Sequence, residues 1–194
     1  MATIYRILAI IFFAGIFGFA KPNSNTINER AETINHQSPM IYDPFAKQLI
    51  QTAKSQLGVR EATGNNDGKQ VEQYLNYTGN KKGEPWCASF VSWVFGQVGL
   101  NQPRTAWSPA LFPKEHLIDA AIPAAVFGIY FMEKKRIAHV GIVEKQTENW
   151  VYTIEGNTNL AGSREGDGVY RKLRHKKSIR YYADWIALGK GGVK

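Results

Sequence analysis

Cysteine is nearly absent from this 194-residue chain, and its scarcity excludes two kinds of protein. Because Cys87 is the only cysteine, no disulfide can form within the chain, and a zinc site with two or more thiolates is excluded. A chain of this length can bury enough apolar surface to fold without such cross-links. The hydrophobic share of 44% and the charged share of 21% are typical of a globular domain.

Negative charge is also in short supply, since the formal net charge is +8. Such a balance favours polyanionic surroundings, which include nucleic acid, anionic membranes and acidic wall polymers. Charge alone does not choose among these three.

The first twenty residues carry one charge, Arg6, followed by an apolar run from Ile7 to Ala20. This run is shorter than the roughly 20 apolar residues that span a membrane. A short apolar stretch that ends in small residues predicts a secretory signal peptide over residues 1–20, with an uncleaved anchor as the alternative. Either one places the protein outside the cytoplasm, in the periplasm or the extracellular space, and argues against a nucleic-acid partner.

Residues 21–42 are polar and aperiodic, which predicts a flexible linker before one domain over residues 43–190. Asp43 and Pro44 are typical of a helix start, and Gly58 of its end. Further helices are predicted over residues 69–76 and 86–98. The helix over 86–98 is apolar on nearly every side, so we expect it to be buried. The small residues that we expect to pack against a sheet are Ser89, Ser92 and Gly96.

The hydrophobic period changes to two after residue 124. Strands are predicted over residues 125–132, 138–144, 150–155, 169–174 and 181–188. Helices first and strands later indicate an α+β fold, with the buried helix packed on an antiparallel sheet of about five strands.

Cys87 falls in the first turn of the buried helix, where free backbone amides and the helix dipole stabilise a thiolate. A lone cysteine in an exported protein suggests a reactive thiol, with an inert buried cysteine as the alternative. Backbone N–H groups of the same turn can also stabilise an oxyanion during acyl transfer.

A nucleophilic thiol needs a base, and the chain offers four histidines. His36 falls in the predicted linker, His116 in a polar stretch and His175 among positive neighbours. His139 begins an otherwise apolar strand, so it is the candidate general base, although a buried structural histidine is the common alternative.

A hairpin that pairs Glu144 with Trp150 places His139 opposite Glu155, with Asn157 on the same face of the sheet. Either side chain can fix the imidazole tautomer. A slip of one residue would separate the partners onto opposite faces.

Three further features surround these candidates. Trp86 and Trp107 are candidates for a substrate groove, with core packing as the alternative. Gly141 lies on the face of His139 and offers room for the helix that bears Cys87, with a bulge or a simple close contact as the alternative. A basic cluster, which either attracts anionic wall polymer or is simply a solvated face, consists of Arg171, Lys172, Arg174, Lys176, Lys177 and Arg180.

Three segments resemble a known family. Residues 84–93 (EPWCASFVSW), 138–143 (AHVGIV) and 154–158 (IEGNT) are similar, in the same order, to segments of CHAP-domain peptidoglycan hydrolases. The resemblance extends over residues 45–188. It implies a papain-like fold and cleavage of amide bonds in peptidoglycan, as an N-acetylmuramoyl-L-alanine amidase or a stem-peptide endopeptidase.

The resemblance assigns Cys87 as nucleophile, His139 as general base and Glu155 as the orienting acid, and Asn157 matches an asparagine often found just beyond. Where some members have a glutamine that contributes to the oxyanion hole, this chain has Trp86, which leaves Tyr77 or another upstream polar group as a possible donor.

The expected cell-wall hydrolase acts on peptidoglycan as a monomer and needs no cofactor and no metal. It contacts no nucleic acid, and no membrane beyond the export signal. The alternatives are a non-catalytic wall-binding module and an acyltransferase or deamidase that uses the same triad.

Overall fold

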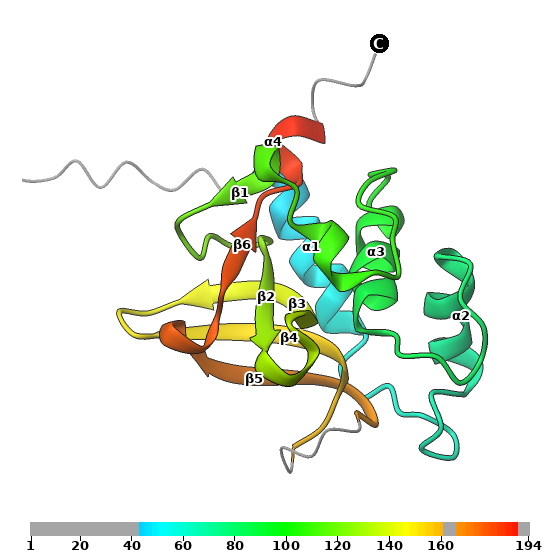
Figure 1. The fold of residues 1–194 in the computed structure, drawn as a ribbon. Helices are drawn as coiled ribbons and strands as arrows, with labels where there is room; N and C mark the ends of the chain where they lie inside the picture. Colours follow the sequence, from blue (N-terminus) through cyan, green and yellow to red (C-terminus); the bar gives the residue numbers. More distant parts are fainter. Residues whose placement is uncertain (1–42, 161–165, 190–194) are drawn as a thin grey trace, which may run out of the picture. The chain divides into compact units, whose positions relative to one another are not determined.

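The computed structural model describes residues 43–160 and 166–189, and Figure 1 shows how their helices and strands are arranged. These residues belong to a compact unit that spans Tyr42–Lys194. The predicted export signal over residues 1–20 and the predicted linker over residues 21–42 lie outside the described residues, and both stay predictions.

Three helices precede the sheet along the chain. They are α1 (Pro44–Ser55), α2 (Lys69–Tyr77) and α3 (Cys87–Gln97). The Asp43 carboxylate accepts a hydrogen bond of 2.9 Å from the Phe45 amide, so the predicted cap starts α1. Helix α3 is buried along most of its length, as its apolar sequence predicts.

The sheet has six strands in the order β1-β6-β2-β3-β4-β5, and every neighbouring pair is antiparallel. The strands are β1 (Leu117–Ile118), β2 (Val126–Phe131), β3 (Arg136–Gln146), β4 (Trp150–Thr158), β5 (Gly168–His175) and β6 (Tyr181–Ala183). The α+β class with an antiparallel sheet is therefore confirmed. The expected number of about five strands misses β1, whose two residues are too short to show a period of two.

The last strand is shorter than the predicted range of residues 181–188. After Ala183, the Asp184 carboxylate accepts hydrogen bonds from the amides of Ile186 and Ala187, at 2.8 and 3.2 Å. This cap starts the short helix α4 (Ile186–Gly189) and ends the strand.

Large apolar side chains, and not the small ones, join α3 to the sheet. Phe90, Val91 and Val94 belong to the same buried cluster as Val140 on β3 and Ile154 on β4. Figure 1 shows α3 beside these strands.

The stripe of small residues was expected on the sheet side, and this expectation is wrong. The Ser89 hydroxyl lies 2.6 Å from the Thr78 hydroxyl, and the Ser92 hydroxyl donates to the Thr105 carbonyl at 2.9 Å. The stripe instead packs against the segments on either side of α3 in the sequence. Its hydroxyl groups form hydrogen bonds there that an apolar sheet face would not offer.

Candidate active site

Cys87 is the first residue of α3, where the backbone amides of the first helical turn have no partner within the helix. Its side chain is a free thiol that is only 6% exposed. Together with His139 it lines a cleft of about 510 Å³. The thiol is therefore nearly buried, yet it opens onto a space large enough for part of a substrate.

The thiol and the imidazole of His139 favour each other's charged forms. Burial disfavours the thiolate, but hydrogen bonding and charge from His139, the Ser108 hydroxyl and the Val140 backbone together outweigh it and lower the pKa of Cys87. Burial likewise opposes charge on His139, but its bonds to Cys87 and Glu155 raise its pKa to about 9. These directions favour a thiolate–imidazolium pair at neutral pH.

Glu155 is fully buried and holds the imidazole from the other side. Its Oε2 atom lies 2.8 Å from His139 Nε2, which leaves Nδ1 to face the thiol. The Thr153 hydroxyl donates to Oε1 at 2.6 Å. Burial raises the pKa of a carboxyl, but here bonds from Arg174 and His139 prevail and lower the pKa of Glu155 to about 2. The carboxylate is therefore charged when it orients the imidazole.

Arg174 donates two parallel hydrogen bonds to Glu155, a contact that was not predicted from the sequence. Its Nε atom donates to Oε1 at 2.9 Å and its Nη2 atom to Oε2 at 2.6 Å. The basic cluster therefore divides, because Arg174 is part of the site. The available signal was the alternation along β5: Arg174 pairs with Val151 and thus lies on the sheet face of Thr153 and Glu155.

The expected hairpin register is wrong by two residues. Ile142 pairs with Ile154 and not with Tyr152, and the Thr147 amide closes the hairpin on the Trp150 carbonyl at 2.8 Å. Because the shift is even at this point, His139 and Glu155 stay on one face and meet diagonally. A bulge in β3, where it pairs with β2, lies directly before His139.

Gly141 makes room for Glu155 itself. A Cβ atom on this residue would lie 2.9 Å from the Glu155 Cγ and 2.7 Å from the Phe127 ring. The expectation that Gly141 admits the helix of Cys87 is therefore wrong, and the alternative of a simple close contact holds, because the space is filled by residues of the sheet.

Asn157 hydrogen-bonds residues other than His139. Its Oδ1 atom accepts from the Trp86 amide at 3.2 Å, and its Nδ2 atom donates to Asn66 Oδ1 at 2.9 Å. Asn157 also has a positive φ of 53° and lines the cleft. Of the two expected partners of His139, Glu155 makes the contact, while Asn157 holds the backbone directly before Cys87.

The two tryptophans differ. Trp86 has no exposed surface, donates from its indole to Glu61 Oε1 at 2.8 Å and stacks on Tyr74 at 5.5 Å between ring centroids. Its expected place in a substrate groove is therefore wrong, and core packing holds instead. Trp107 is 54% exposed, and the Arg136 guanidinium lies 4.3 Å from its ring centroid.

Ser108 and Tyr77 differ in whether they lie near the Cys87 sulfur. The Ser108 hydroxyl, which no sequence pattern marked, lies 3.6 Å from Cys87 Sγ and is buried. Tyr77 packs near the far end of α3, where a Cβ atom on Gly96 would lie 2.2 Å from its hydroxyl. Nine residues of helix span about 13 Å, so Tyr77 is wrong as an oxyanion donor.

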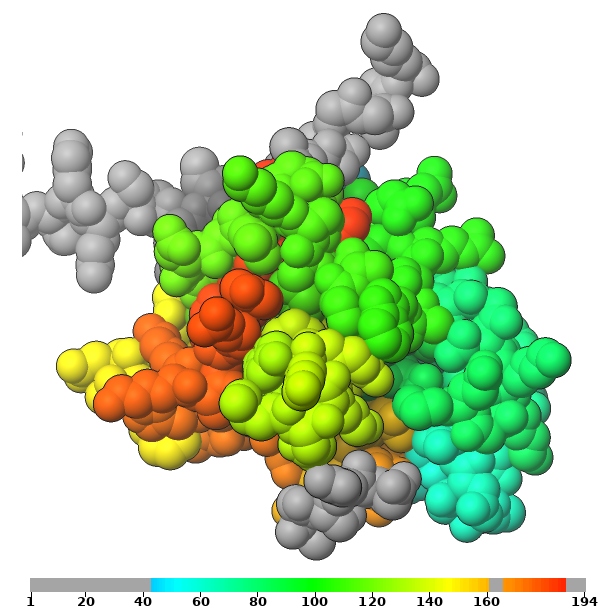
Figure 2. All heavy atoms as spheres, viewed as in Figure 1, coloured from blue at the N-terminus to red at the C-terminus, as the bar shows by residue number. Residues whose placement is uncertain are grey.

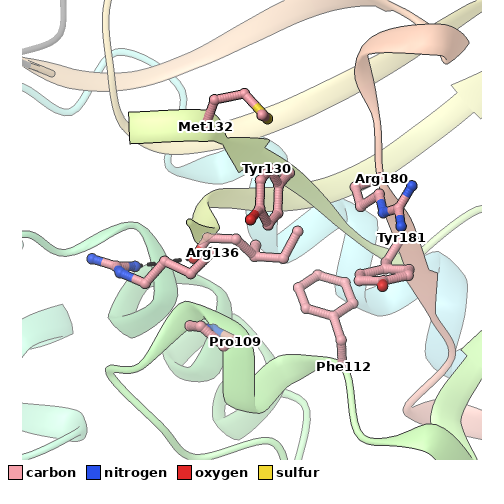
Figure 3. A pocket seen from close by; sticks show the side chains of 8 residues that line it. Pro109, Phe112, Tyr130, Met132, Arg136, Arg180 and Tyr181 are labelled. Atoms are coloured by element: carbon pink, nitrogen blue, oxygen red, sulfur yellow. Dashed lines mark hydrogen bonds between the residues drawn. The ribbon is translucent and has the colours of Figure 1, made fainter. Parts of the chain in front are cut away.

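A second hollow of about 540 Å³ is lined by aromatic rings and arginines (Figure 3). Strand β2 separates the two spaces, since Ile129 and Phe131 line the cleft whereas Tyr130 and Met132 line this second hollow. We call it the aromatic hollow. Its lining includes Phe112, Tyr130, Tyr181, Met132, Arg136 and Arg180.

Within residues 43–160 and 166–189, no three His, Cys, Asp or Glu side chains gather as a metal site would require. The helices of that same part are too short or too polar to cross a membrane. His139 is the histidine that lines the cleft. His116 bonds the Asp184 carbonyl at 2.8 Å, and His175 accepts from the Lys177 amide at 3.1 Å.

No protein-family model and no curated protein matches the sequence. Among solved structures, the chain is similar to a protein described as similar to a lipoprotein of the NLP/P60 family, from Staphylococcus aureus subsp. aureus Mu50. The identity is 15% and the TM-score 0.39. The alignment covers 77% of this chain but only 44% of the other.

Proposed function

We propose that the protein is a papain-like cell-wall hydrolase that cleaves amide bonds in peptidoglycan. The observation that carries this proposal is the relay from Cys87 through His139 to the buried Glu155, with the thiol opening onto a cleft. Activation of a nucleophile by a base that a third group orients is the arrangement that acyl transfer requires. The three sequence segments that resemble CHAP-domain hydrolases supply the substrate class.

In the proposed reaction, the thiolate of Cys87 attacks the carbonyl carbon of an amide. Backbone amides of the first turn of α3 stabilise the resulting oxyanion. His139 then gives its Nδ1 proton to the leaving amine, and a thioester remains on Cys87. A water molecule, deprotonated by the same imidazole, attacks the thioester and restores the thiol.

Glu155 and Arg174 support these steps without touching the substrate's reacting atoms. Glu155 holds the imidazole through Nε2, and the two-fold grip of Arg174 keeps the carboxylate oriented and charged. Trp107 is the remaining candidate for contact with a distant part of the substrate, because it is exposed and adjoins Ser108.

Peptidoglycan as partner agrees with two features of the sequence, the predicted export signal and the net charge of +8. We therefore propose that the enzyme is exported and acts in the periplasm or outside the cell. None of the steps above needs a metal or an organic cofactor.

The test is digestion of purified sacculi by wild type and by Cys87→Ala, with released carboxyl and amino groups measured together. We expect wild type to release both in equal amounts and the variant to release neither. His175→Ala serves as the control, since His175 lies outside the lining of the cleft. Circular dichroism checks that both variants fold.

Three outcomes would contradict this proposal. Hydrolysis by Cys87→Ala would exclude a thiol nucleophile. Binding of sacculi by wild type without hydrolysis, together with slow alkylation of Cys87 by iodoacetamide at neutral pH, would indicate a non-catalytic wall-binding module. Transfer of the acyl group to an added amine, with no free carboxylate, would indicate an acyltransferase.

A further inference from the structure

The described residues that line the cleft of Cys87 include cations but no carboxylate. Three cationic side chains line it, Lys134, Lys172 and Arg174, and none of its described lining residues is an aspartate or a glutamate. Glu155 is near but fully buried beneath the lining.

The charges of the reacting groups cancel one another. Arg174 and Glu155 are bonded as an ion pair, and transfer of a proton from Cys87 to His139 leaves that pair without net charge. Among the described lining residues, Lys134 and Lys172 are left over, so this part of the lining carries two positive charges that no carboxylate of the same set balances. In a partly enclosed cleft such charges are screened less than on an open surface.

Lys172 lies where its ammonium group can bind an anion in the cleft. It is half-buried on β5, two residues from Arg174 and on the same face of the sheet, so the two Cα atoms are about 7 Å apart. Its Nζ atom donates one hydrogen bond of 2.5 Å to the Asn159 carbonyl. An ammonium group has three donors, and this bond within the described residues uses one of them.

Lys134 approaches the cleft from another element. It lies on the exposed 3-10 turn Met132–Lys134, which follows β2. Cations from two separate elements therefore border one space, and an anion in it would satisfy both.

We propose that Lys172 and Lys134 form a subsite for a free carboxylate of the substrate, beside the amide that Cys87 attacks. This inference rests on the proposed function and adds that the preferred wall peptide carries an unblocked carboxylate. Lys172 and Cys87 line one space of about 510 Å³, so they lie on the order of 10 Å apart. An extended chain covers that distance in about three residues.

The experiment compares sacculi before and after their carboxylates are converted to carboxamides with carbodiimide and ammonia. Wild type should digest untreated sacculi about 10- to 100-fold faster than amidated ones, the range of a hydrogen bond between charged groups. Lys172→Met should reduce this preference to within about threefold by slowing digestion of untreated sacculi only. Lys134→Met, on an exposed turn where folding is not at stake, should reduce the preference in part.

The control is Lys177→Met, an exposed lysine outside the cleft lining, which should keep the full preference. An equal loss in Lys177→Met would mean that overall charge, and not the subsite, attracts the wall, and would overturn the inference. Equal digestion of both sacculi by wild type would also overturn it while the proposed function stands. Digestion of neither would contradict the proposed function itself.

Discussion

Strand β2 divides two spaces of nearly equal size, the cleft of about 510 Å³ and the aromatic hollow of about 540 Å³. Ile129 points into the first and Tyr130 into the second, because successive residues of a strand face opposite sides. Volume does not distinguish them. The cleft is lined by a thiol and an imidazole, and a buried carboxylate lies beneath its lining. The aromatic hollow is lined by aromatic rings and by side chains of arginine and methionine.

The difference lies in how each space holds its charges. Arg136 and Arg180 line the aromatic hollow (Figure 3). The Arg136 guanidinium stacks on Trp107, and Arg180 is exposed. Figure 2 shows the yellow-green segment around β2 beside the red-orange segment that leads into β6. At the cleft, the charged groups are bonded in sequence, from Arg174 to Glu155 and on to His139. Buried and mutually paired charges can set each other's pKa values, which a solvated rim cannot do.

The largest expected effect separates the two arginines. Arg174→Met removes the guanidinium that balances the buried Glu155 carboxylate and leaves it the bonds from His139 and Thr153, so the free energy of unfolding at pH 7 should fall by about 3–5 kcal/mol. Arg180→Met, at the rim of the aromatic hollow, should change it by no more than about 0.5 kcal/mol. Urea denaturation measures both. Equal losses would mean that charge pairing does not distinguish the cleft.

Acid should lower the free energy of unfolding by protonating Glu155. The folded pKa of Glu155 is about 2, below its ordinary value of 4.5, so its carboxylate stabilises the fold fully above pH 4.5. That contribution is lost as the pH falls from 4.5 toward 2. Urea denaturation between pH 2 and 6 should show a weaker pH dependence in Glu155→Gln than in wild type, and identical curves would exclude this role.

Two glycines on adjacent strands make a matched pair. A Cβ atom on Gly141 would lie 2.9 Å from both the Ile154 carbonyl oxygen and the Glu155 Cγ, so Gly141→Ala should cost about 1–3 kcal/mol and displace Glu155. A Cβ atom on Gly128 would lie 2.6 Å from the tip of the half-buried Phe112 ring at the aromatic hollow.

A ring tip can move away, whereas a backbone carbonyl cannot. Gly128→Ala should therefore be more stable than Gly141→Ala and should hydrolyse sacculi at close to the wild-type rate. Thermal unfolding and the digestion assay together test the pair. A variant at Gly141 that hydrolyses as fast as the one at Gly128 would show that the position of Glu155 is not critical.

The smallest effect concerns neighbours on the turn that follows Trp107. The Ser108 hydroxyl helps to lower the pKa of Cys87, so Ser108→Ala should raise that pKa and move the pH profile of iodoacetamide alkylation upward. Pro109→Ala, which alters the aromatic hollow, should leave the profile unchanged. In both variants hydrolysis should decline above about pH 9, where His139 loses its proton. Coincident alkylation profiles would exclude Ser108 as a partner of the thiol.

Local patterns predicted several parts of this molecule. Asp43 and Pro44 mark the start of α1, and the apolar run from Trp86 identifies α3 as buried, because caps and periodicity act within a few residues. The contact between His139 and Glu155 could also be predicted. A register error of two residues leaves both side chains on the same face of the sheet.

The rest depended on contacts between distant segments. Alternation along β5 assigns Arg174 to a face of the sheet but does not name its partner, and no local pattern distinguishes Ser108 from a loop serine. Only the packing of β5 and of the 3-10 turn Ser108–Leu111 brings the two residues to the site. The burial of Trp86 likewise follows from its packing on Tyr74.

The sequence by itself determined the order of helices and strands, the helix start at Cys87 and the candidate histidine, because each follows from interactions among near neighbours. Only the tertiary structure decided which cation bonds to Glu155, which of Trp86 and Trp107 is exposed, and which of the two spaces the thiol lines. These outcomes depend on strand register and layer packing, which are set by contacts among residues far apart in the chain.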